Sequence, residues 1–192
     1  MNDKNLKWTK ISSEIGDDLA ILKVRHDWLR HPRSGKVLKR LVLESVDWVN
    51  IVAITPEGKS VMVRQYRFGI ESCTLETAGG MVDHGESPLK AAQRELREET
   101  GYGNGKWSYL GAVEPNPAFH PNLCHHFVAH DVKHLGDPIP GEGEEIQVEL
   151  HGPDELKQEI RNGSLRHSLA LSALSRVFQL WDLPFVQSED SS

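Results

Sequence analysis

The sequence predicts an α/β protein with a small antiparallel sheet at its N-terminus. Two observations carry this prediction: segments with the short apolar or alternating pattern of strands recur along the chain, and segments with helical periodicity lie between and after them. The length of 192 residues and the 38% hydrophobic content suit one domain core with a small extension.

The N-terminal strands are predicted at residues 18–25 and 37–46, with a polar turn at residues 32–35 between them. Trp28 lies in the polar segment 26–30, which is predicted to be part of the connection. Two strands joined in this way form a small antiparallel sheet of their own.

The remaining elements follow in order. Strands are predicted at 48–55 and 60–67, joined by the turn Pro56-Glu57-Gly58-Lys59, and then at 107–114, 124–132 and 145–150. Two helices are predicted at the end, over 153–162 and 167–181. The order of strands and helices indicates a sandwich of sheet and helices.

The composition excludes several function classes. A net charge of −6 argues against a nucleic-acid partner, which normally requires a basic surface. No apolar run approaches the length that spans a membrane, and the first residues lack a signal-like apolar segment. Two cysteines, Cys73 and Cys124, provide no disulfide framework, so a cytoplasmic location is expected.

Residues 80–102 hold the most informative pattern. A helix is predicted to begin after the N-cap Ser87 with Pro88 in its first turn and to end at Gly101. Its apolar stripe is predicted to contain Leu89, Ala92 and Leu96. The same helix carries three glutamates, at positions 95, 98 and 99.

The three glutamates repel one another, since like charges at i, i+4 cost roughly 0.2–0.5 kcal/mol. A hard divalent cation held by carboxylate oxygens would offset this repulsion. Arg94 stands four residues before Glu98, so it can orient one carboxylate while the others bind metal. The alternative is an ordinary solvated amphipathic helix with mixed surface charges.

The whole stretch resembles the Nudix box. The matching positions are Gly80, Glu86, Arg94, Glu95, Leu96, Glu98, Glu99 and Gly101. The resemblance implies the Nudix fold, a mixed β-sheet sandwiched between helices. It implies a Nudix hydrolase domain over residues 45–183, a β extension over 1–44 for dimerisation and nucleobase contacts, and a tail over 184–192.

The resemblance also implies a metal site. Glu95, Glu98, Glu99 and the backbone carbonyl of Gly79 would hold Mg²⁺, for which Mn²⁺ can substitute. The structural positions of the box would be Gly80, Glu86, Arg94 and Gly101, with Glu86 acting on the loop through Arg94. The cation would neutralise the diphosphate of a substrate so that water can attack phosphorus.

Several segments outside the box resemble the ADP-ribose pyrophosphatase-like branch of this family. They are Gln65-Tyr66-Arg67, the Glu76-Thr77-Ala78-Gly79-Gly80 entry to the box, in which Gly79 replaces the usual alanine, and Pro117. The resemblance implies that Arg67, Glu76 and Pro117 bind substrate and that Trp28 stacks on the nucleobase. An ordinary structural tryptophan remains the alternative for Trp28.

An acidic loop at residues 141–145 is the second candidate for chemistry. Such a loop is normally only solvated, but in the resembling branch the catalytic base lies on a loop at this point. By position Glu142 matches the base and Glu144 an added metal ligand, with Glu144 and Glu98 as rival bases.

The resemblance therefore implies hydrolysis of a nucleoside diphosphate sugar, with ADP-ribose as the first substrate, by a homodimer. Three alternatives stay open: a nucleotide-binding sensor without turnover, hydrolysis of another nucleoside diphosphate derivative such as an ADP-hexose or GDP-mannose, and mRNA decapping. The intact glutamates disfavour the sensor, and the acidic net charge disfavours decapping.

Overall fold

The computed structural model describes residues 6–139, 141 and 143–181. Contacts divide the chain into two compact units. The N-terminal unit contains residues up to 47 together with the segment 114–123. The central unit contains residues 48–113 and those from 124 onward. Each unit is described here by itself.

Three antiparallel strands form the N-terminal unit, in the order β1 (Thr9–Asp18), β2 (Lys23–Arg30) and β3 (Val37–Glu44). The segment 114–123 joins them, because the Leu43 amide donates to the Phe119 carbonyl over 2.8 Å. The predicted N-terminal antiparallel sheet is thus confirmed, although it has three strands instead of two.

Two details of that prediction are wrong. Residues 19–22 form the connection between β1 and β2, so no strand runs over 18–25. Trp28 lies inside β2 and not in a polar turn. The strand β1 is exposed along its whole length and has no alternating burial, which explains why an apolar pattern did not reveal it.

The central unit is built on a six-stranded mixed sheet of order β11-β5-β6-β4-β9-β8. The pair β4–β9 is parallel and the other neighbours are antiparallel. The bounds are β4 (Trp48–Ile54), β5 (Ser60–Arg67), β6 (Ser72–Met81), β8 (Lys106–Val113), β9 (Cys124–His130) and β11 (Ile146–His151). A short 3₁₀ turn, η2 (Phe68–Ile70), follows β5, and the two-residue strands β7 (Tyr102–Gly103) and β10 (Lys133–His134) pair separately.

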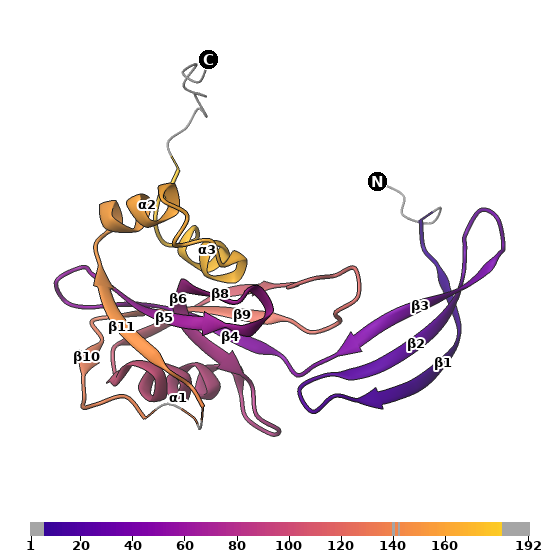
Figure 1. Ribbon diagram of the computed structural model, residues 1–192, viewed down its shortest axis with the longest axis horizontal. Coiled ribbons are helices and arrows are strands. Elements are labelled where there is room, and N and C mark those ends of the chain that lie inside the picture. The colour runs from indigo at the N-terminus through magenta and orange to yellow at the C-terminus, as the bar shows by residue number, and fades with distance from the viewer. Residues whose placement is uncertain (1–5, 140, 142, 182–192) are drawn as a thin grey trace, which may run out of the picture. The chain divides into compact units, whose positions relative to one another are not determined.

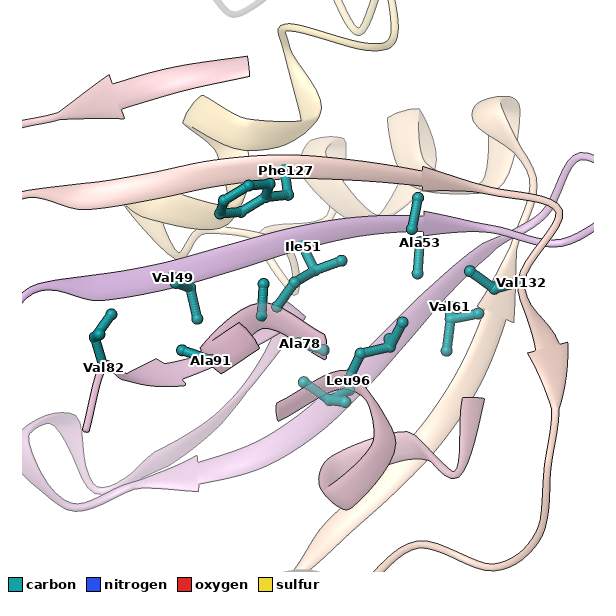
Figure 2. Packing of buried hydrophobic residues seen from close by; sticks show 13 residues of the cluster. Val49, Ile51, Ala53, Val61, Ala78, Val82, Ala91, Leu96, Phe127 and Val132 are labelled. Carbon is teal, nitrogen blue, oxygen red and sulfur yellow. The ribbon is translucent and has the colours of Figure 1, made fainter. Parts of the chain in front are cut away.

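Helices cover both faces of this sheet, as Figure 1 shows, with α1 (Pro88–Thr100) on one face and α2 (Pro153–Arg161) and α3 (Ser168–Leu174) on the other. Two buried apolar clusters fill the interfaces. The cluster beneath α1 includes Val49, Ile51 and Leu96, as Figure 2 shows. The cluster beneath the other helices includes Val52, Leu75 and Leu174. The predicted mixed sheet between helices is confirmed.

The ends of α1 follow the predicted local signals. The Ser87 hydroxyl accepts a hydrogen bond from the Lys90 amide over 3.4 Å, and Gly101 ends the helix with a φ of 73°. The apolar stripe differs from the prediction, because Leu89 is exposed and Ala91 is buried beside Ala92 and Leu96.

Two further elements differ from the sequence-based prediction. Residues 72–81, which include the entry to the box, form the central strand β6. The last helix is shorter than the predicted range 167–181, since α3 ends at Leu174 and the residues after it pack on the same cluster without continuing the helix.

Candidate active site

The carboxylate site is built where β6 ends against α1. Glu99 is 5% exposed, and its Oε2 atom accepts a hydrogen bond from the Gly79 amide over 2.9 Å. Glu95, one turn earlier, lies against Gly80, where a Cβ atom would come within 2.4 Å of the Glu95 carboxylate. A side chain at residue 80 would therefore displace Glu95.

Gly79 is also required by packing. A Cβ atom at this position would lie 2.2 Å from the Val49 carbonyl oxygen of the neighbouring strand β4 and 2.7 Å from the side-chain nitrogen of Asn50, Nδ2. The strands could not stay paired at this distance. Glycines at 79 and 80 thus bring the end of β6 close to both β4 and the glutamates of α1.

Arg94 organises the outer side of the site. Its Nη2 atom donates to Glu86 over 3.0 Å and to the Met81 carbonyl over 3.0 Å. These bonds tie residues 82–87, called here the box loop, to the helix. Its Nη1 atom donates to Glu95 over 2.8 Å and to Glu98 over 3.2 Å. The expected contact between Glu86 and Arg94 is present, and the hydrogen bond from Arg94 lowers the pKa of Glu86.

On the inner side of the site, two glutamates, Glu99 and Glu95, have pKa values above that of an ordinary glutamate. Burial raises the pKa of Glu99 to about 8, and the charges of Glu95 and Glu144 add to the shift against the opposing Gly79 hydrogen bond. Burial also raises the pKa of Glu95, although the contact with Arg94 opposes it. A divalent cation would favour the ionised form of both groups.

The donor set fits a hard cation, because the described atoms are carboxylate and carbonyl oxygens. Within the described ranges, no three His, Cys, Asp or Glu side chains are already arranged to hold a metal ion. Arg94 forms ion pairs with Glu95 and Glu98 in this arrangement, at 2.8 and 3.2 Å.

A second buried group holds Arg67 at the end of β5. Glu76 is 1% exposed and accepts two hydrogen bonds from Arg67, over 2.8 and 2.6 Å. The Thr74 hydroxyl donates to the same carboxylate, and His167 Nδ1 lies 3.6 Å from it. The guanidinium is thereby oriented by two of its nitrogens, while the side chain of Arg67 keeps 42% of its exposure.

Thr74 and His167 had no sequence signal of their own. His167 also caps α3, where its Nδ1 atom accepts from the Ala170 amide over 3.4 Å. Its sequence distance from Glu76 is too large for a local pattern to reveal the contact.

The acidic loop is described in part. Glu144 is exposed, and its carboxylate accepts a hydrogen bond from the Gly141 amide over 3.0 Å. Its charge reaches Glu95, Glu99 and Arg67, and it raises the pKa values of all three groups. Glu142 lies outside the described residues.

Two predicted substrate contacts belong to the N-terminal unit. Trp28 is half-buried with the Lys39 ammonium 5.0 Å from its ring centroid, and Pro117 lies in an exposed turn of the segment 114–123. Their roles in substrate binding stay predictions. None of the helices in the described part of the chain has the length and apolar character needed to traverse a membrane.

The fold and the glutamate-bearing helix together define a Nudix-type α/β domain. The NUDIX domain family model matches residues 46–171, so this chain belongs to that family. Members of the family generally use divalent metal cations.

Known proteins agree with this assignment. An ADP-ribose pyrophosphatase from Mycobacterium tuberculosis is 30% identical over 87% of this chain and 81% of that protein. Another ADP-ribose pyrophosphatase, from Bacillus subtilis, is 36% identical over 53% of this chain, which spans only 55% of that protein. A solved structure of an ADP compounds hydrolase has a TM-score of 0.76 at 24% identity over 89% of this chain and 92% of that one, which supports the fold.

Proposed function

We propose that this chain hydrolyses the diphosphate linkage of a nucleoside diphosphate sugar to a nucleoside monophosphate and a sugar phosphate, with ADP-ribose as the first substrate. The observation that carries this proposal is the pair of helix glutamates at the end of β6, Glu99 bound by the Gly79 amide and Glu95 against Gly80, together with an arginine, Arg67, that the buried Glu76 orients. The names of the relatives from Mycobacterium tuberculosis and Bacillus subtilis support the substrate class.

The proposed ligand set consists of Glu95, Glu98, Glu99, Glu144 and the Gly79 carbonyl. The proposed cation is Mg²⁺, with Mn²⁺ as a substitute, and it would supply charge neutralisation at the diphosphate oxygens. Gly79 fixes Glu99 through its amide, and Arg94 holds the box loop against α1. The Gly79 contact keeps the Glu99 carboxylate in place before substrate arrives.

Arg67 is proposed to bind a phosphate oxygen of the substrate. Glu76 holds the guanidinium by two hydrogen bonds and is itself buried, so the arginine is pre-oriented and loses little freedom on binding. An arginine suits this role because its planar fork of donors matches phosphate geometry.

The general base is proposed to be Glu142, with Glu144 and Glu98 as rivals. Each could accept the proton of the attacking water from the acidic side of the site. A base substitution such as Glu142→Gln should lower kcat by about 10²–10⁴ with little change in substrate affinity. A loss below tenfold would transfer the role to Glu144 or Glu98.

Substrate selection is proposed to involve the N-terminal unit. Trp28 would stack on the nucleobase, Pro117 would contact the substrate, and the chain would act as a homodimer. A cytoplasmic location is the matching prediction, which fractionation of the host cell would test.

The deciding experiment is phosphate release from a panel of substrates, with Mg²⁺ and excess phosphatase. The panel contains ADP-ribose, ADP-glucose, GDP-mannose, UDP-glucose, diadenosine polyphosphates and capped RNA. A dominant rate on one diphosphate sugar would support the proposal and name the substrate. Binding of ADP-ribose without any turnover would instead favour a sensor, and turnover of capped RNA would favour decapping.

A further inference from the structure

A five-residue segment, residues 135–139, lies along the C-terminal turns of α1 and is called here the anchor segment. The Leu135 amide donates to the Gly101 carbonyl over 2.8 Å, and the Ile139 amide donates to the Glu98 carbonyl over 2.7 Å. Carbonyls at a helix end have no partner within the helix. The anchor segment therefore completes the end of the helix that carries the glutamates.

Arg97 reinforces this attachment from the helix side. Its Nη1 atom donates to the Asp137 carbonyl over 3.0 Å and to the Gly136 carbonyl over 3.5 Å. Arg97 thus stands in sequence among Glu95, Glu98 and Glu99, while its guanidinium holds the backbone of the anchor segment.

Two glycines permit the close contact. A Cβ atom on Gly101 would lie 2.0 Å from the Gly136 carbonyl oxygen, and Gly101 itself has a φ of 73°. Gly136 has a φ of 145°, which side-chain-bearing residues rarely adopt. Glycine at these two positions therefore allows the backbone of the anchor segment to lie in direct contact with the end of α1.

The anchor segment contacts the part of α1 that carries two of the glutamates. Its Ile139 amide binds the carbonyl of Glu98 itself, and the next residue, Glu99, accepts the hydrogen bond from the Gly79 amide over 2.9 Å. The place of the last turns of α1 against β6 therefore sets where these two carboxylates lie.

We propose that Arg97 is a positioning residue, whose guanidinium clamps the anchor segment to α1 and thereby holds in place the last turns of the helix, which carry Glu98 and Glu99. This inference deepens the proposed function and rests on its assignment of those glutamates. A positive side chain near the C-terminus of a helix also stabilises the helix through its dipole. That effect requires no hydrogen bonds to two carbonyls of another segment.

The test compares Arg97→Ala and Arg97→Lys with the wild-type chain. Arg161, the basic residue in the last turn of α2, supplies the matched control Arg161→Ala. Three readouts are measured on each full-length protein: thermal unfolding, Mn²⁺ affinity without substrate by electron paramagnetic resonance, and kcat and KM on ADP-ribose.

Arg97→Ala is expected to weaken Mn²⁺ binding and lower kcat, each by at least tenfold, with KM changed less than threefold and Tm close to that of Arg161→Ala. Arg97→Lys is expected to restore only part of the loss, because an ammonium lacks the planar fork. If Arg97→Ala fails to fold, the Arg97→Lys variant alone provides the test.

Mn²⁺ affinity and kcat within twofold of wild type in Arg97→Ala would overturn the inference. Full restoration by Arg97→Lys would overturn it too, because charge at the helix end would then suffice. A wild-type chain that turns over no diphosphate sugar would defeat the proposed function instead, and the Mn²⁺ titration would still decide the role of Arg97.

Discussion

Glu99 is an acidic side chain with almost no exposure, and burial raises its pKa to about 8. Near neutral pH the folded metal-free chain favours the protonated form. In the unfolded chain the pKa of this residue has its ordinary value of 4.5. Ionisation of Glu99 therefore opposes folding as pH rises from that value through about 8. A bound cation would reverse that preference.

Glu99→Gln removes this conflict together with a proposed metal ligand. We expect turnover to be lost, while the metal-free variant unfolds at a Tm equal to or above that of the wild type at pH 8.5. Glutamine can still accept the Gly79 hydrogen bond, so the fold should persist. Scanning calorimetry and turnover measure both effects, with the exposed Glu71→Gln as the control. A near-full rate in Glu99→Gln would show that the ligand assignment is wrong.

His126 is a second buried titratable residue, on the face of β9 opposite α1. It is 0% exposed, and within the described residues neither ring nitrogen has a hydrogen-bond partner. Burial lowers its pKa to about 4, and the charges of Arg176 and His125 act in the same direction. The unfolded chain therefore binds the proton more readily between pH 4 and the ordinary value near 6.5.

From this sign, the free energy of unfolding should fall as pH falls through that window. Between pH 7 and pH 5 the loss from His126 should be about 2 kcal/mol. His126→Leu should remove this part of the pH dependence, whereas His130→Gln, exposed on the same strand, should keep it. Urea unfolding at the two pH values measures the difference, and equal slopes in His126→Leu and wild type would contradict the assignment.

At the scale of elements, α1 and β6 differ in how far local signals reveal them. The ends of α1 could be predicted because the Ser87 cap and Gly101 act within a few residues of chain. The strand β6 could not, since its sequence contains the polar residues Thr74, Glu76 and Thr77 and two glycines. Partners from β4 and β5 satisfy Thr77 and Glu76, and those contacts exist only once the sheet has formed.

Gly79→Ala tests how tightly β6 is built into the sheet. The added Cβ would meet the Val49 carbonyl at 2.2 Å, so the β4–β6 pairing must shift. We expect a loss of about 1–3 kcal/mol in the free energy of unfolding, as in other overpacked cores. Gly69→Ala is the control, because a Cβ there meets no atom within 4 Å. Equal stability of the two variants in urea unfolding would contradict the steric argument.

At the scale of the whole molecule, the site outside the box could be predicted only in part. Resemblance indicated Arg67 and Glu76, but the contact of His167 with Glu76 and the clamp at Arg97 involve segments far away in sequence. The membership of residues 114–123 in the N-terminal unit was equally hidden, because it depends on a pairing with β3.

The exposed apolar side chains of the N-terminal unit, among them Ile15 at 65% and Leu41 at 47% exposure, lead to a prediction about assembly. We expect the 21.6 kDa chain to sediment as a dimer and Ile15→Lys to weaken that dimer. Ile70→Lys, an exposed apolar position of the central unit, is the control. A monomer at every concentration in analytical ultracentrifugation would contradict the homodimer.

The N-terminal unit is made of two separate segments of the chain, and this has a consequence for biosynthesis. The three strands can pair as soon as Glu44 has left the ribosome, but the backbone that hydrogen-bonds Leu43 is made only when Phe119 has followed. The intervening residues 48–113 supply most strands of the central sheet. Closing so long a loop has an entropy cost that grows with its length. A gene fragment that ends near residue 47 would therefore encode an incomplete module.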